Sequence, residues 1–284
     1  MRAVRPRRPG YEMIDNVQKR NALKNESINR FFKASVKDLT PTDSHHDISV
    51  LFMPAEHSGY PADCLASVLS LAELARAERF KAIADKTRFL QRRAFRRFCG
   101  AIALGVARPL SQVDFTATRN GRPYLPELPR TWFSFSSCDH GYLAAWSSSG
   151  AIGVDIEDSE QSVSPVEMAR YHFAPNELDA VCKAEVHERR RLFLRLWTLK
   201  EAALKSIGEG MSYGLDAIQF DTTPTVRVSF APERYGSPIN FNARLMKIAD
   251  CCAALVIRNR PRSRRQPSPA DGNSTYGRLI RAHY

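Results

Sequence analysis

One five-residue segment, Gly153–Glu157 (GVDIE), limits what this part of the chain can form. Its β-branched residues favour an extended strand. Side chains alternate along a strand, so Asp155 and Glu157 point to one side and Ile156 points to the other. The segment therefore predicts a strand that carries two carboxylates on one face.

A second segment, Trp197–Lys205 (WTLKEAALK), is made mostly of residues with high helix propensity. Trp197, Glu201 and Lys205 follow one another at intervals of four residues. Because residues four apart lie on the same side of an α-helix, these three side chains share one stripe. The segment predicts a helix that presents a carboxylate and an ammonium in line.

If this strand meets this helix, the carboxylates of Asp155, Glu157 and Glu201 converge, with Lys205 one turn beyond. Three carboxylates cannot stay ionised together without a counterion. Either their pKa values rise or a hard cation such as Mg²⁺ lies among them. Taken alone, each segment is also typical of a solvated surface, with the helix stabilised by pairs of opposite charge.

Together the two segments closely resemble the signature motifs of the 4′-phosphopantetheinyl transferases, and the longer, Sfp-like branch is the better match. Other stretches are similar to parts of that family: a basic helix between Ser70 and Phe89, a turn at 120–126, Phe133–Cys138 and a glycine-rich turn at 207–212. The order and spacing hold from about residue 47 to about residue 258.

The sequence departs from the family pattern at three positions. Ser134 stands where the family usually has asparagine, and Ser137 where it has the histidine that helps to hold the 3′-phosphate of coenzyme A. His140 is close in sequence and could substitute for that histidine. A basic position early in the first helix is Glu73, which leaves more of the phosphate binding to Arg76.

The resemblance implies transfer of the 4′-phosphopantetheine arm of coenzyme A to a serine of an apo acyl or peptidyl carrier protein, with Mg²⁺, releasing 3′,5′-ADP. It assigns Asp155, Glu157 and Glu201 to the metal. The catalytic base is Glu201 or Glu157, and Lys205 stabilises the leaving phosphate. The expected contacts to coenzyme A come from Arg76, Arg88, Arg122, Ser136, Ser137, Lys200 and Lys205, because guanidinium groups bind phosphate in a two-pronged geometry.

Composition sets outer limits. The 284 residues are 43% hydrophobic, enough for a packed core. No stretch approaches the roughly 20 apolar residues of a membrane span, and the basic N-terminus lacks the apolar segment of a secretory signal. The six cysteines form no C-x-x-C motif and no zinc spacing. We therefore expect a cytoplasmic protein, and the resemblance to the two-lobe branch implies a monomer.

The formal net charge of +12 would suit a nucleic-acid-binding protein. However, residues 1–30 carry +5 and residues 258–284 carry +6, which leaves +1 for the centre. The excess charge thus belongs to the two ends, whose composition predicts disorder. Nucleic acid is not an expected partner of the central part.

The predicted fold is α+β, with two similar α/β lobes related by a pseudo-twofold axis, as the resemblance implies. We expect a disordered basic extension at 1–46, an N-terminal lobe at 47–149, a C-terminal lobe with the metal site at 150–258, and a disordered basic tail at 259–284. A cleft between the lobes would hold the cofactor.

Two other functions remain open at this point. Three carboxylates with Mg²⁺ and a lysine also suit a metal-dependent phosphodiesterase or nuclease. A non-catalytic protein that binds nucleic acid through its arginine-rich ends is the other alternative, although the centre has no motif of a nucleic-acid-binding module. The carrier protein, whether of fatty-acid, polyketide or nonribosomal-peptide synthesis, is not specified by the sequence.

Overall fold

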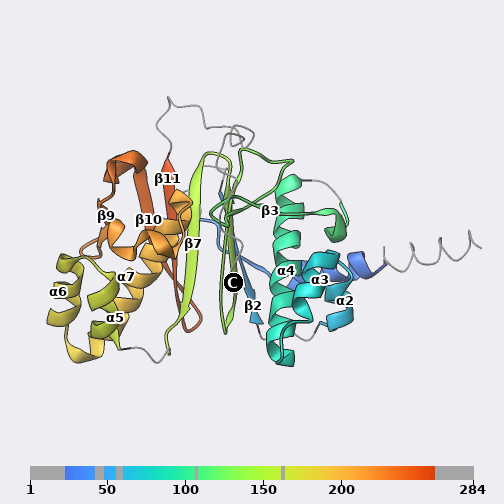
Figure 1. The fold of residues 1–284 in the computed structure, drawn as a ribbon, viewed down its shortest axis with the longest axis horizontal. Coiled ribbons are helices and arrows are strands. Elements are labelled where there is room, and N and C mark those ends of the chain that lie inside the picture. The colour runs from blue at the N-terminus through green and yellow to red at the C-terminus, as the bar shows by residue number, and fades with distance from the viewer. Residues whose placement is uncertain (1–22, 42–47, 56–59, 106–107, 161–163, 260–284) are drawn as a thin grey trace, which may run out of the picture.

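The computed structural model describes residues 23–41, 48–55, 60–105, 108–160 and 164–259. Its elements form four layers: a long helix, two β-sheets packed face to face, and a second long helix (Figure 1). Each lobe contributes one sheet and one long helix.

In the N-terminal lobe the antiparallel sheet has the order β1 (Lys37–Asp38), β2 (Ile48–Pro54), β6 (Gly141–Ser147) and β5 (Trp132–Cys138). Its outer face packs on α4 (Ile83–Leu104). The other elements of this lobe are α2 (Ala62–Ala66), α3 (Leu71–Ala77), η2 (Leu110–Gln112), β3 (Thr116–Ala117) and β4 (Pro123–Tyr124).

In the C-terminal lobe the antiparallel sheet has the order β10 (Phe241–Ile248), β11 (Cys251–Asn259) and β7 (Gly150–Asp158). Its outer face packs on α7 (Val186–Ile207). The other elements are α5 (Pro165–His172), α6 (Pro175–Lys183), β8 (Gln219–Asp221), β9 (Arg227–Phe230), and the 3₁₀ turns η3 (Met211–Tyr213), η4 (Leu215–Ala217), η5 (Glu233–Tyr235) and η6 (Pro238–Asn240).

The two sheets bury one apolar layer between them. Val50 and Leu143 of the N-terminal lobe pack there with Val154, Ile156 and Leu255 of the C-terminal lobe. All five side chains are fully buried or nearly so. Because apolar burial is the main favourable contribution to folding, this layer holds the two lobes in a fixed relation.

The predicted α+β fold with two lobes is confirmed. The strand predicted at Gly153–Glu157 lies within β7, and the helix predicted at Trp197–Lys205 lies within α7. Residues 165–183 form two separate helices, α5 and α6. Pro175 explains the break, because proline lacks the N–H that a continuous helix requires and suits the first position of a new one.

The predicted extension at residues 1–46 is wrong in its second half. Residues 23–35 form a helix, and residues 37–38 pair with β2 as strand β1. Ile28 and Phe32 of that helix are fully buried in the N-terminal core, where the Phe32 ring stacks on Phe98 at 5.0 Å between centroids. The lobe therefore begins well before residue 47. Residues 1–22 and the tail at 260–284 lie outside the described residues.

Within the part of the chain that the structure describes, no helix combines the length and the apolar character needed to span a membrane.

Candidate active site

The site is organised where α7 crosses β7. A Cβ atom at Gly153 would overlap the carbonyl oxygen of Ala202 and the backbone nitrogen of Ser206 on α7. Only glycine permits this close approach of strand and helix backbones. Gly153, the glycine that begins the GVDIE segment, thus brings Asp155 within reach of α7.

Asp155 is the centre of the polar network. Its side chain is buried, and its Oδ1 accepts hydrogen bonds from Lys205 Nζ at 2.7 Å and from Ser136 Oγ at 2.7 Å. Lys205 Nζ also lies 3.1 Å from Ser136 Oγ. The second carboxylate oxygen, Asp155 Oδ2, is buried and has no hydrogen-bond partner in the structure.

Glu201 lies half-buried on the same helix stripe as Lys205. Burial raises the pKa of Glu201, the negative charge of Asp155 raises it further, and Lys205 opposes both effects. Two neighbouring carboxylates, one with an unpartnered buried oxygen, fit a hard divalent cation. The residues present are therefore suitable ligands for Mg²⁺.

Glu157 is in contact with helix α7. Trp197 Nε1 donates a hydrogen bond to Glu157 Oε1 at 3.1 Å. We searched the described residues for three His, Cys, Asp or Glu side chains whose ligand atoms all lie within 4.8 Å of one another. Only one such group is found there, and it consists of Cys138, His140 and Cys251. Asp155, Glu157 and Glu201 do not form such a group, so the predicted convergence of their three carboxylates is incomplete.

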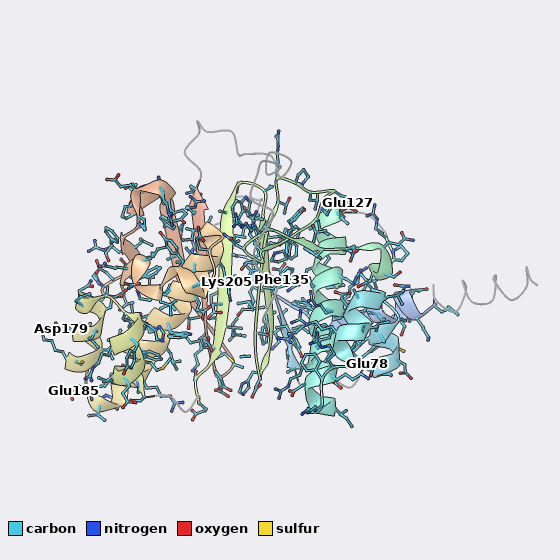
Figure 2. The ribbon with its side chains drawn as sticks, viewed as in Figure 1. Glu78, Glu127, Phe135, Asp179, Glu185 and Lys205 are labelled. Atoms are coloured by element: carbon cyan, nitrogen blue, oxygen red, sulfur yellow. The ribbon has the colours of Figure 1, made fainter. Side chains whose placement is uncertain are left out.

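Two cavities open beside this network along the boundary between the lobes. The Glu201 cavity, of about 280 Å³, is lined by residues of both lobes that include Asn120, Arg122, Glu201, Lys205 and Gly208. The Ser137 cavity, of about 250 Å³, is lined only by the N-terminal lobe and includes Arg76, Arg92, Arg93, Ser136 and Ser137. Figure 2 shows Lys205 and Phe135, which both line the Glu201 cavity, close together between the lobes.

Arg96 and Phe135 line both cavities, so the two hollows adjoin at these side chains. The Arg96 guanidinium lies 4.7 Å from the centre of the Phe135 ring. Burial lowers the pKa of Arg96 to about 10, which still leaves it cationic at neutral pH. Arg92, Arg93 and Arg96 line the Ser137 cavity and were not among the residues predicted for the site. Their spacing of three to four residues along one helix was the signal that would have found them.

Arg122 belongs to the Glu201 cavity and is held by stacking. Its guanidinium lies 3.6 Å from the centre of the Trp132 ring. The preceding turn contacts the other lobe, because Asn120 Nδ2 donates hydrogen bonds to the Gly208 carbonyl at 3.1 Å and to Glu209 Oε2 at 3.3 Å. This contact joins the turn at 120–126 to the glycine-rich turn after α7.

Lys200 does not serve the cavities, which corrects its predicted role. Its side chain is fully buried, forms an ion pair with Glu177, and donates hydrogen bonds at 2.8 Å to the carbonyls of Leu215 and Ile218. One residue along a helix is a rotation of about 100°, which turns Lys200 from the Glu201 stripe into the C-terminal core. Burial lowers the pKa of Lys200, and Glu177 opposes that shift.

Arg88 and His140 lie elsewhere. Arg88 forms an exposed ion pair with Asp139 at 2.9 Å, and Nδ1 of His140 lies 3.2 Å from Asp158 Oδ2. Both residues line a cavity of about 620 Å³ that shares Tyr142 with the Ser137 cavity. His140 itself does not line the Ser137 cavity. Arg76, Ser136 and Ser137, by contrast, share one cavity.

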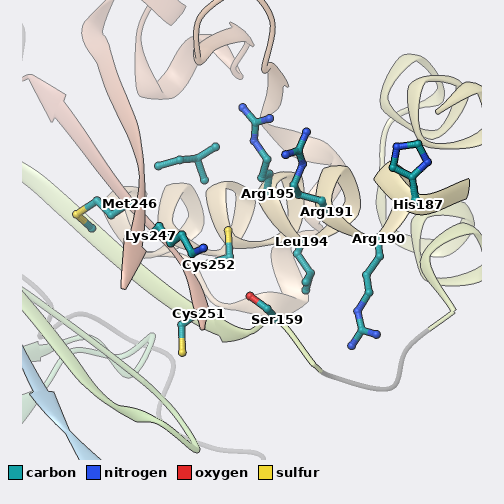
Figure 3. Close-up of a pocket in the computed structure, with 11 residues that line it drawn as sticks. Ser159, His187, Arg190, Arg191, Leu194, Arg195, Met246, Lys247, Cys251 and Cys252 are labelled. Carbon is teal, nitrogen blue, oxygen red and sulfur yellow. The ribbon is translucent and has the colours of Figure 1, made fainter. Parts of the chain in front are cut away.

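The largest cavity described, of about 650 Å³, lies over the N-terminal half of α7 (Figure 3). It is lined by basic side chains that include Arg190, Arg191, Arg195 and Lys247. Asp155, Glu201 and Lys205 do not line this cavity. Glu201 and Lys205 line the Glu201 cavity at the lobe boundary instead.

Sequence comparison identifies the family to which this architecture belongs. The profile of the 4′-phosphopantetheinyl transferase superfamily matches residues 151–256, which contain α7 and all of β7 except its first residue. The 4′-phosphopantetheinyl transferase HetI of Nostoc sp. is 32% identical over 57% of this chain and 68% of that protein. The chain belongs to the 4′-phosphopantetheinyl transferase family, as its two signature segments predicted.

Other relatives are similar over shorter shares of their length. A protein of Synechocystis sp. is 35% identical over 54% of this chain and 62% of its own length, which is less than two thirds. The 4′-phosphopantetheinyl transferase Sfp of Bacillus subtilis is 30% identical over 38% of this chain and 46% of that protein. The structure of the holo-[acyl-carrier-protein] synthase of Thermotoga maritima overlaps 40% of this chain and 64% of that one, with a TM-score of 0.33 and 18% identity, too distant to add to the assignment.

Proposed function

We propose that this protein transfers the 4′-phosphopantetheine arm of coenzyme A to a serine hydroxyl of an apo carrier protein. The hydroxyl oxygen forms a bond to the phosphorus next to the pantetheine arm, and the bond between that phosphorus and the bridging oxygen breaks. The products are the holo carrier protein and 3′,5′-ADP. We also propose that the protein acts as a cytoplasmic monomer.

The observation that carries this proposal is the meeting of opposite charges at the lobe boundary. Asp155 and Glu201 lie beside Lys205 on the C-terminal lobe. Arg96 and Arg122 face the same cavity from the N-terminal lobe. A polyanionic cofactor with a diphosphate suits such a cleft, because one wall can bind its phosphates while the other supplies a metal and a base.

Asp155, Glu157 and Glu201 are the proposed ligands of Mg²⁺. A bound Mg²⁺ would supply positive charge to the diphosphate oxygens. The unpartnered Asp155 Oδ2 supports this assignment, because a buried carboxylate oxygen without a donor is costly unless a cation takes that place.

Glu201 is the proposed base that accepts the proton of the carrier serine. A serine hydroxyl is a weak nucleophile and needs such a base. Glu201 lines the cavity, as a base that meets the incoming hydroxyl group must do. Glu157 is the weaker candidate, since its carboxylate already accepts a hydrogen bond from Trp197.

Basic side chains are the proposed ligands of the cofactor phosphates. Lys205 stabilises the charge that develops on the leaving phosphate, and Ser136 adds a hydroxyl donor beside it. Arg122 and Arg96 bind the diphosphate, and the Ser137 cavity with Arg76 receives the 3′-phosphate. Guanidinium groups suit this task because they donate two parallel hydrogen bonds to one phosphate.

Mass spectrometry of an apo carrier protein tests the proposal. The carrier is incubated with coenzyme A, Mg²⁺ and the purified protein, and a mass gain of one phosphopantetheine group is the expected result. Asp155→Asn should lose the activity, while the control Asp179→Asn, at an exposed ion pair on α6, should keep it. Acyl and peptidyl carriers are tested side by side to identify the carrier class.

The same protein is incubated with plasmid DNA and single-stranded RNA under identical conditions. Cleavage of either, together with no mass gain on any carrier, would replace the transferase with the phosphodiesterase alternative. Holding the Mg²⁺ concentration and adding a chelator in a parallel sample tests the metal requirement.

A further inference from the structure

A second group of potential metal ligands lies beside the C-terminal end of β7, at Asp158. Cys138 Sγ and Cys251 Sγ are 3.5 Å apart, and a ring nitrogen of His140 completes a set whose members all lie within 4.8 Å of one another. No residue of this group takes part in the proposed transfer. Cys251 pairs with Asp158, which lies three residues beyond Asp155 on β7. The group is therefore about 10 Å from Asp155 along the strand.

The three ligands come from both lobes. Cys138 ends β5 and His140 lies in the turn before β6, whereas Cys251 begins β11 in the C-terminal lobe. Alternation along β11 turns Cys251 toward the layer between the sheets and Cys252 toward the α7 side. Figure 3 shows the two sulfurs on opposite sides of the strand.

The ligand types and spacing fit a tetrahedral zinc ion. Thiolates and imidazole are the ligands that Zn²⁺ prefers, and at a Zn–S distance of about 2.3 Å two thiolates lie about 3.8 Å apart. The observed separation of the two sulfurs needs only a small adjustment to reach that value. His140 is partly exposed, which leaves a route for the ion to enter.

A carboxylate holds the histidine in place. Asp158 Oδ2 lies 3.2 Å from Nδ1 of His140. Histidines that bind metals commonly donate one ring N–H to a carboxylate, which fixes the ring orientation. With Nδ1 beside Asp158, Nε2 is the ring nitrogen left for a metal. The group therefore has a supporting residue as well as three potential ligands.

We propose that Cys138, His140 and Cys251 bind one Zn²⁺ that links the two lobes. Each thiol releases its proton to solvent when it binds the ion, and water fills the fourth position. The ion closes a connection between residues 113 positions apart in the sequence, and it thereby stabilises the packing of the β5–β6 hairpin on β11.

Titration of the reduced, metal-free full-length protein with Co²⁺ tests this site. Tetrahedral cobalt bound by thiolates absorbs strongly in the near ultraviolet and visible range. We expect one Co²⁺ per chain, displaced by one Zn²⁺, in wild type and in the control Cys252→Ser. Cys138→Ser and Cys251→Ser should lose the absorption, and His140→Ala should bind at least tenfold more weakly.

Circular dichroism of each metal-free variant checks that it is folded, and thermal melts with and without Zn²⁺ test the link between lobes. Zn²⁺ should raise the melting temperature of wild type and of Cys252→Ser but not of Cys251→Ser. Absence of cobalt absorption in wild type, its survival in Cys251→Ser, or binding without a rise in melting temperature overturns the proposal. A mass two daltons lower before reduction, with no metal uptake after it, would show a redox-active disulfide instead.

Discussion

Lys205 Nζ lies 2.7 Å from Asp155 Oδ1, and this pair joins the C-terminal half of α7 to the centre of β7. The lysine neutralises one oxygen of the buried carboxylate and leaves the other without a partner. It also lowers, but does not cancel, the rise in the pKa of Glu201. The pair thus sets the electrostatic conditions under which Glu201 works.

We expect Glu201→Gln to lose carrier loading while the protein remains at least as stable as wild type. Removal of a general base slows a reaction by about 10²–10⁴-fold. Because the folded state raises the pKa of Glu201, its ionised form opposes folding at neutral pH, and the neutral amide relieves that cost. Single-turnover loading rates and thermal melts measure the two effects.

Glu188→Gln is the matched control, since Glu188 lies in the first turn of the same helix and pairs with Arg191. It should retain both loading rate and stability. A normal loading rate in Glu201→Gln, with loss of activity in Glu157→Gln, would transfer the role of base to Glu157.

Arg122→Ala should weaken coenzyme A binding more than it slows turnover. A phosphate held away from the reacting atoms contributes mainly uniform binding. Loss of one charge-assisted hydrogen bond costs about 1.5–3 kcal/mol, which corresponds to about 10–150-fold in apparent affinity. Steady-state kinetics with coenzyme A as the varied substrate give both quantities.

Arg119→Ala, which removes an exposed arginine just before the same turn, serves as the comparison and should change neither value. A large decrease in turnover at unchanged apparent affinity would contradict the assignment of Arg122 to a remote phosphate.

Lys200→Ala should destabilise the protein by about 3–5 kcal/mol, because it leaves the Glu177 carboxylate buried without its cation. Chemical denaturation measures the free energy of unfolding. The exposed ion pair of Lys183 with Asp179 provides the contrast, and Lys183→Ala should change stability by less than about 1 kcal/mol. Equal effects in the two variants would mean that Lys200 is not a core residue.

Acid should remove part of the stability of the N-terminal lobe through Glu73. Burial alone would raise the pKa of Glu73, but the hydrogen bond from the Ser70 backbone and the ion pair with Arg97 at 2.7 Å lower it below the usual value of 4.5. A lowered pKa in the folded state stabilises the protein above pH 4.5, and this contribution disappears as the pH falls through the folded-state pKa.

Unfolding free energies of wild type and Glu73→Gln, measured from pH 7 down to pH 3, test this relation. The difference between the two proteins should be greatest at neutral pH and should shrink in acid. Glu78→Gln, at an exposed ion pair with Lys86, should show a small difference with little dependence on pH. If the difference in unfolding free energy between wild type and Glu73→Gln is the same from pH 7 to pH 3, the proposed contribution of Glu73 is refuted.

Local patterns were sufficient to predict the strands and helices that carry the acidic half of the site. The alternation in Gly153–Glu157 and the four-residue spacing in Trp197–Lys205 are properties of single elements, and they fix which side chains share a face. The helix at 23–35 was missed because its basic residues suggested an exposed extension, whereas the apolar positions Ile28 and Phe32 are what bury it.

Relations between elements were harder to predict. Lys200 lies next to Glu201 in sequence, yet its surroundings depend on α6 and on the carbonyls of the loop before β8. Cys138 and Cys251 have no diagnostic spacing, because the packing of the two sheets against each other, rather than sequence proximity, brings their sulfurs together. A pattern of a few residues does not show which residues of distant elements come into contact.

Because both lobes line the Glu201 cavity, the affinity for a ligand in it depends on how the two lobes pack together. Arg96 and Arg122 belong to one lobe, and Glu201 and Lys205 belong to the other. A cofactor that contacts both walls therefore opposes separation of the two sheets. By mass action, such a ligand stabilises the docked arrangement, and any substitution that loosens the apolar layer around Val154 and Leu143 reduces cofactor affinity without touching the cofactor.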